Sequence, residues 1–167
     1  MVRVLACICF VFAGAITGLV LSDKLKQKRE GSREIYSMLV QISSLIRYRR
    51  LNVYEIVREL NSSKNYKYLR FLSQLPECYN PGEDFHEQWF RSLITDRELS
   101  DDERSLLLSF GSVLGTSDVE GQLMYIESSL ESVKALEQRR TEEYQQKGKL
   151  YRSLGILFGT MVGIMFI

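Results

Sequence analysis

The sequence predicts an all-α protein, in which an antiparallel bundle of about six helices lies between an N-terminal and a C-terminal transmembrane helix. Apolar runs open and close the chain, and apolar residues between them recur at helical spacing without strand-like alternation of useful length. Helix-capping sequences also precede several of these stretches. The predicted divisions are residues 1–22 for the first transmembrane helix, 23–152 for the helical-bundle domain and 153–167 for the second transmembrane helix.

The composition excludes several classes of function. The chain has 22 Lys and Arg against 21 Asp and Glu, so it has no electrostatic field that would favour nucleic acid as a partner. Its single histidine, His86, lies in the first turn of a predicted amphipathic helix, where we expect a solvated ring. The whole chain has only this histidine and three cysteines, which are few residues for a zinc, haem or Cys/His catalytic site. We therefore predict no catalytic, cofactor-binding or metal site.

The first apolar run is predicted to be an uncleaved membrane anchor. Val4 to Leu21 contains Thr17 as its only polar residue, and as a helix it would be about 27 Å long, close to the ~30 Å of a bilayer core. Ala13–Ala15 resembles a signal-peptidase site, and Val4–Cys7 resembles a lipobox. Both alternatives fit less well, because only Arg3 supplies positive charge before the run and apolar residues continue past both sites.

The second apolar run, Leu154 to Ile167, is shorter. A helix of this length would extend about 21 Å, so it spans a bilayer only with help from its neighbours. Arg152 can place its charge at the headgroups while its stem lies along the apolar region. The alternative is a hydrophobic tail that packs on its own domain. Because the run is apolar around the whole helix, the sequence favours the membrane.

Cations on one side of both runs predict the orientation of the chain. The residues that follow the first run or precede the second are Lys24, Lys26, Lys28, Arg29, Arg33, Lys147, Lys149 and Arg152. Arg3 alone lies on the opposite side. The domain between the runs is therefore expected to face the cytoplasm, where the Cys78 thiol stays reduced.

Glycines at helical spacing predict close helix packing in both runs. Gly14 and Gly18 are four residues apart in the first run, and Gly155, Gly159 and Gly163 continue the same spacing in the second. Such a face lets two helix backbones approach closely in a membrane. The residues leave open whether the partner is the first run, another copy of the chain or another protein.

Three helices are expected in the first half of the domain. Ser32 is predicted to cap a helix whose apolar stripe contains Ile35, Leu39, Ile42 and Ile46. Asn52 and Glu55 resemble a capping box that starts a second helix. A third helix is expected over Tyr66–Leu72, ending near Pro76.

Three further helices are expected after the Asn80–Gly82 turn. Asp84 is predicted to start one helix, and capping boxes at Ser100–Glu103 and Ser117–Glu120 are predicted to start the next two. The last helix carries a heptad seam made by Val119, Leu123, Ile126, Leu130 and Val133. It would lead into the second apolar run. Gly31 and Gly148 are compatible with flexible joints.

The segment Gly111–Ser117 has a faint likeness to a phosphate-binding loop. It lacks the lysine, the spacing of the glycines and the preceding strand that such a loop needs. We expect instead that Gly111 lets a neighbouring helix cross closely and that Gly115 ends its helix in a left-handed conformation.

Two groups of residues mix cations with aromatic rings. They are Arg47–Arg50, and Lys64, Lys67 and Arg70 together with Tyr66 and Tyr68. Such surfaces can bind RNA or anionic lipid. We favour a plainer interpretation, in which these cations complement a helix C-terminus or pair with the acidic segments 83–103 and 127–143.

Taken together, the arrangement resembles the stage III sporulation protein AB family. The likeness covers the whole chain, and it is most specific from Leu114 to Gln122, where the residues read L-G-x-S-D-x-x-x-Q. Related proteins usually have Thr-Pro-Leu before the second helix, whereas this chain has Arg50–Val53. The resemblance implies a place in the mother-cell membrane around the forespore, within a multiprotein channel of endospore-forming bacteria.

The resemblance also implies partners. The family's cytoplasmic domain is similar to the helical domains of inner-membrane platform proteins in type II secretion and type IV pilus systems, which couple an ATPase to a membrane assembly. The implied ATPase is stage III sporulation protein AA, with other membrane proteins of the same channel as neighbours. Independently of the resemblance, a second copy of the chain is a further candidate partner.

The residues themselves favour a structural role. We expect Gly111, Gly115, Ser117, Asp118 and Gln122 to set the corner where the last two helices meet, without acting in catalysis. The rival class is an independent membrane adaptor or sensor that uses the helical domain as an interaction module. An enzyme is a more distant third, because it would need a pocket with convergent polar groups.

Overall fold

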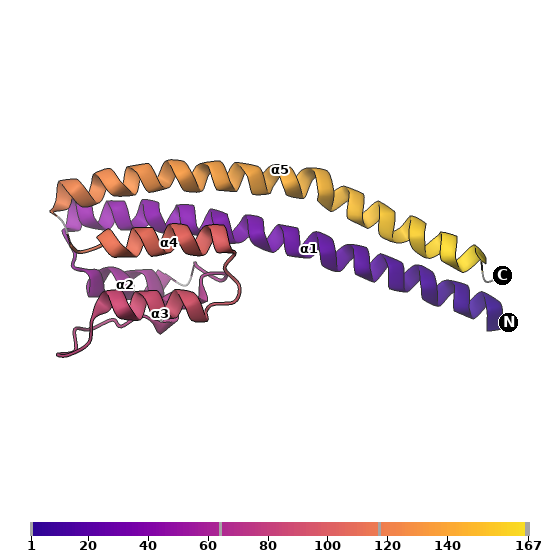
Figure 1. Cartoon of the computed structure of the whole chain (residues 1–167), viewed down its shortest axis with the longest axis horizontal. Helices are drawn as coiled ribbons and strands as arrows, with labels where there is room; N and C mark the ends of the chain where they lie inside the picture. The colour runs from indigo at the N-terminus through magenta and orange to yellow at the C-terminus, as the bar shows by residue number, and fades with distance from the viewer. Residues whose placement is uncertain (1, 64, 117, 166–167) are drawn as a thin grey trace. The chain divides into compact units, whose positions relative to one another are not determined.

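The computed structural model describes residues 2–63, 65–116 and 118–165, and within its terminal helices the description leaves out the side chains of residues 2–11, 152, 156, 159 and 163–165. The elements in chain order are α1 (Val2–Ser44), the π-helix η1 (Leu45–Arg49), α2 (Val53–Ser63), the 3-10 helix η2 (Arg70–Gln74), α3 (Phe85–Thr95), α4 (Asp101–Val113) and α5 (Val119–Met165). Among the described residues all regular structure is helical, which confirms the all-α prediction (Figure 1).

The chain forms two compact units. Unit 1 consists of residues 1–29 and 138–167, and unit 2 of residues 30–137. The two long helices, α1 and α5, belong partly to each unit. Both continue as α-helix through Gly31 and Gly148. Flexibility at these two glycines stays a prediction.

In unit 1, the start of α1 and the end of α5 pair side by side in antiparallel directions (Figure 1). Gly155 of α5 approaches Gly14 and Gly18 of α1, while Gly148 lies against Ser22. The two helices therefore run in opposite directions in this unit. Among the residues that the structure describes, no helix has both the length and the apolar character required to cross a membrane.

Unit 2 holds the hydrophobic core. Its largest fully buried side chains come from the last turns of α1, from α2, from η2 and the residue before it, and from α3 and α4. They are Ile35, Met38, Leu39, Ile42, Ile56, Leu60, Leu69, Phe71, Trp89, Leu93, Leu107 and Phe110. From α5, Ile126 and Val133 are buried in the same core, and Leu123 and Leu130 are partly buried against it. These four are members of the predicted heptad seam, whereas Val119 is exposed.

Local capping explains where most of these helices begin. The Asn52 side chain accepts hydrogen bonds from the N–H groups of Tyr54 and Glu55, and the Glu55 carboxylate accepts one from the Asn52 N–H. This is the predicted capping box of α2. Asp84 caps α3 by accepting from the N–H of His86 at 3.1 Å. The boxes predicted for α2 and α4 and the start predicted for α3 are confirmed.

The prediction of a third helix over Tyr66–Leu72 is wrong. This segment instead runs irregularly into the short 3-10 helix η2. The Tyr68 N–H donates to the Glu34 carboxylate at 2.8 Å, and the Phe71 N–H donates to the buried Asp96 carboxylate at 2.9 Å. Two backbone donors are thus satisfied by distant side chains rather than by an α-helical ladder. Burial raises the pKa of the Glu34 carboxyl, an effect that the bond from Tyr68 partly offsets.

Ser32 is not a helix cap, which corrects the prediction. α1 passes straight through this position, and the buried Ser32 hydroxyl donates to Glu103 Oε1 at 2.7 Å. The other carboxylate oxygen, Oε2, accepts from the N–H and the hydroxyl of Ser100 at 2.9 and 2.7 Å. Glu103 is only 2% exposed. One side chain therefore completes the capping box of α4 and ties α4 to α1.

Glu103→Ala should cost about 3 kcal/mol of folding free energy, since the buried donors of Ser32 and Ser100 would lose a charged acceptor. Glu131→Ala removes an exposed carboxylate and should change the free energy by less than about 0.5 kcal/mol. Urea unfolding of the full chain, followed by the fluorescence of the single tryptophan, measures both. Equal midpoints for the two variants would contradict the role assigned to Glu103.

Candidate functional site

The predicted corner lies between the end of α4 and the start of α5. Gly115 has φ of +81°, the left-handed conformation expected at a helix C-terminus. Its N–H donates to the side-chain Oε1 of Gln122 at 3.3 Å, and Asp118 Oδ1 accepts from the N–H of Gly121 at 3.2 Å. Gln122 therefore reaches back from the first turn of α5 to hold the turn that precedes it.

A capping contact is present at the start of α5. Asp118, which immediately precedes the first helical residue Val119, accepts from the N–H of Gly121, while the predicted box beginning at Ser117 stays a prediction. Ser117 itself lies outside the described residues. The structure thus brings Gly115, Asp118 and Gln122 together in one hydrogen-bonded corner.

Gly111 lies one turn earlier, where α3 crosses α4. A Cβ atom at this position would lie 2.1 Å from Nε1 of Trp89, a distance that atoms do not reach. The missing side chain lets the Trp89 indole lie on the α4 backbone and donate to the Leu107 carbonyl at 2.9 Å. His86 Nδ1 lies 2.9 Å from the Gly111 carbonyl oxygen. The ring of His86 is partly buried, so the expectation of a solvated histidine is wrong.

Two residues of this corner, Trp89 and Val53, were not predicted from the sequence. Trp89 packs on Gly111, and Val53 packs on Gly115. A Cβ atom on Gly115 would lie 2.7 Å from Cγ1 of Val53, so the start of α2 packs directly against the turn. A tryptophan and a mid-helix glycine are the only signals in the sequence that could have indicated such a contact.

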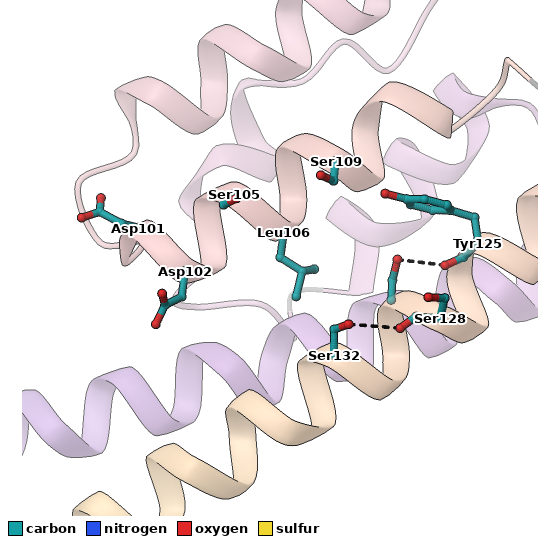
Figure 2. Close-up of a pocket in the computed structure, with 9 residues that line it drawn as sticks. Asp101, Asp102, Ser105, Leu106, Ser109, Tyr125, Ser128 and Ser132 are labelled. Carbon is teal, nitrogen blue, oxygen red and sulfur yellow. Dashed lines mark hydrogen bonds between the residues drawn. The ribbon is translucent and has the colours of Figure 1, made fainter.

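An open groove of about 520 Å³ runs between α4 and α5 (Figure 2). It is lined by Asp101, Asp102, Ser105, Leu106, Ser109, Tyr125, Ser128, Ser129 and Ser132. Ser129 donates to the Tyr125 carbonyl and Ser132 to the Ser128 carbonyl, so part of the hydroxyl capacity is used within α5. Neither histidine nor lysine is among these lining residues, and a serine nucleophile needs such a base. The groove's small side chains are suited to protein contact.

The predicted membrane-packing glycines fall in unit 1. A Cβ atom on Gly155 would lie 2.5 Å from the Gly14 carbonyl oxygen and 3.1 Å from Cα of Gly18. The surroundings of Gly159 and Gly163 lie outside the described part of the chain. Of the partners that the sequence left open, the structure places the start of α1 against Gly155.

The seam of small residues is longer than the sequence indicated. Ser22 is buried, and a Cβ atom on Gly148 would lie 3.3 Å from its Oγ. One heptad separates Gly148 from Gly155, so both lie on the same face of α5. Past this seam, the Arg29 guanidinium lies 4.7 Å from the centre of the Tyr144 ring, a cation–π contact.

Several cations of the two basic groups are paired in unit 2. Arg47 contacts Glu127 at 3.0 Å, Arg49 contacts Glu59 at 2.7 Å, and Arg70 lies 3.6 Å from Glu98. Arg50 holds the left-handed end of η1, with φ of +49°. Two of these pairs, Arg47 with Glu127 and Arg70 with Glu98, use the acidic segments that the sequence proposed as partners.

The fold and the site define a class of small, all-helical protein in which the predicted site residues fix the geometry of helices. Residues 3–167 match the family model described as Stage III sporulation protein AB. The chain therefore belongs to the stage III sporulation protein AB family, as its sequence predicted, and is a protein of sporulation. Comparison with curated proteins and with solved structures gave no match.

Gly115→Val should destabilise unit 2 by about 3 kcal/mol, because a β-branched residue resists positive φ and its Cβ would overlap Val53. Gly82, with φ of +92° and open space around it, is the matched control. Gly82→Val should cost only about 1 kcal/mol, the conformational part. Urea unfolding and spore counts of both strains test this. If Gly115→Val is as stable as the wild-type chain, the role assigned to Gly115 is contradicted.

Gly155→Leu should force the ends of α1 and α5 apart and cost about 2 kcal/mol through overpacking against Gly14. Ser153→Leu makes a similar change at an exposed position of the same helix and should have little effect. Thermal unfolding of the purified full chain measures this loss of stability. Identical melting of the two variants would contradict the seam.

Proposed function

We propose that this chain is a membrane-anchored platform component of the sporulation channel between mother cell and forespore. In this role it couples a cytoplasmic ATPase, stage III sporulation protein AA, to the membrane assembly. Membership of the family supports the place in sporulation. The fold supports the mechanical part of the proposal.

The observation that carries the proposal is the continuity of the two long helices. α1 has 43 residues and α5 has 47, and each runs from unit 2 into unit 1 without a loop. Neither helix contains proline, which is one of the usual causes of a sharp kink. In this proposal, a displacement of unit 2 passes along both helices, because no loop interrupts them.

Anchoring is the second element of the proposal. The apolar runs Val4–Leu21 and Leu154–Ile167 are the segments that would enter the membrane, and lysines and arginines follow the first and precede the second. Unit 2 would then face the cytoplasm, where an ATPase can reach it. Close packing of Gly155 on Gly14 and Gly18 suits a membrane helix pair.

A second candidate function is an independent membrane adaptor, in which unit 2 binds a regulator and no force passes through the helices. The serine-lined groove between α4 and α5 favours it, since small side chains on both helices allow a third helix to approach. The two functions differ in whether a bend in α5 matters once the partner is bound.

Gln138→Pro tests this difference. Gln138 is an exposed residue of α5. Proline at this position removes a backbone hydrogen bond and should destabilise the helix by about 3 kcal/mol. The substitution does not change a surface that unit 2 uses. Gln138→Ala is the matched control. A tag in the Asn80–Glu83 turn allows partners to be purified from sporulating cells and identified by mass spectrometry. We expect the proline variant to retain the ATPase but lose spore formation, and the alanine variant to keep both.

Two outcomes would contradict the platform proposal. Normal spore formation by Gln138→Pro would show that continuity of α5 is not needed, which favours the adaptor. Recovery of the tagged wild-type chain alone, or with an unrelated regulator in place of the ATPase, would remove the proposed coupling directly.

A further inference from the structure

A small pocket lies between the end of α2 and the irregular segment that leads into η2. Its floor is formed by Leu60, Leu69 and Leu72, which are at most 3% exposed. Asn61, Tyr66, Arg70 and Ser73 complete the lining. An apolar floor with a polar rim is the usual form of a recognition pocket.

The segment that forms the pocket is held rigidly. The carboxylates of Glu34 and Asp96 accept from the backbone of Tyr68 and Phe71, and the Tyr66 hydroxyl donates to Gln41. These contacts come from α1 and from the end of α3. The pocket therefore does not have to form when a partner arrives, which lowers the entropic cost of binding.

The size of the pocket selects its occupant. Its volume is about 240 Å³, below the roughly 300–1,000 Å³ of most small-molecule sites. One large apolar side chain would fill such a space. Interfaces commonly anchor on a single residue of this kind seated in a well-packed pocket.

The charge at the rim of the pocket indicates which group of the partner lies beside that apolar side chain. The Arg70 side chain is 69% exposed, and its 3.6 Å separation from Glu98 is too long for a hydrogen bond. Asn61 and Ser73 already donate to Glu77 and to the Arg70 carbonyl. Arg70 is the charged residue in the lining, and its guanidinium has donors beyond the one that faces Glu98. A guanidinium binds carboxylates well.

We propose that this pocket binds one large apolar side chain from an acidic segment of a partner protein, with Arg70 binding a carboxylate next to it. The proposal stands apart from the membrane anchoring and the ATPase coupling. It gives the basic and aromatic residues around Tyr66 a role as a peptide-binding surface, not as a nucleic-acid or lipid surface.

A photo-crosslinking amino acid placed at Ser73 in the full chain, in sporulating cells, tests the proposal. Ser62 provides the matched control, because it is also an exposed serine that donates to a carbonyl of its own turn but lies outside the pocket. Mass spectrometry should identify a crosslinked peptide from Ser73 with a large apolar residue beside Asp or Glu, absent from the Ser62 sample. No crosslink, the same peptide from both positions, or a peptide without a carboxylate would overturn it.

Charge reversal provides the second measurement. Arg70→Glu should reduce this crosslink at least about tenfold, and replacing the partner carboxylate with lysine should restore it. Unchanged tryptophan fluorescence would show that unit 2 remains folded. If Arg70→Glu leaves the crosslink unchanged, the charge argument fails. If the purified chain instead binds phosphatidylglycerol vesicles or single-stranded RNA through Arg70, and a bulky Ser73→Phe has no effect on that binding, the surface is not a peptide site.

Discussion

The contact between the Trp89 indole and the bare backbone of Gly111 is the interaction on which the packing of unit 2 depends. It sets how closely α3 and α4 approach, and the indole N–H fixes the ring through the Leu107 carbonyl. The same ring meets Phe71 of η2 and Phe110 of α4 at centroid distances of 5.4 and 5.9 Å. Three elements therefore share one side chain, and a change in any of them must be accommodated by the others, since a close-packed core has little free space.

Two buried carboxylates, those of Glu103 and Asp96, add hydrogen bonds to this apolar packing. Glu103 and Asp96 each serve a local and a distant partner at once: Glu103 binds Ser100 in its own capping box and Ser32 of α1, while Asp96 accepts from the Glu98 N–H and from the Phe71 N–H. Each carboxylate is buried, so its hydrogen bonds must be satisfied within the protein. This double use links the start of a helix to the tertiary fold.

These double roles also explain which parts of the fold could be predicted from the sequence. The starts of α2 and α4 were predictable because a cap and its partner lie three residues apart, as at Asn52 and Ser100. Ser32 was misassigned because its partner lies 71 residues away. The helix expected at Tyr66–Leu72 fails for the same reason, since the groups that replace its ladder are distant in sequence. At the candidate site, the conformation of Gly115 follows from local spacing, but its neighbour Val53 does not.

The two long helices are tied to each other in each unit by different chemistry. In unit 1 the tie is backbone on backbone, with Gly155 against Gly14. In unit 2 it is the shared apolar core, and just past the end of α1 the ion pair of Arg47 in η1 with Glu127 of α5 adds to it. Neither helix is interrupted between the units. A partner that binds the preformed pocket beside η2 need not distort either helix, because recognition there uses an irregular segment.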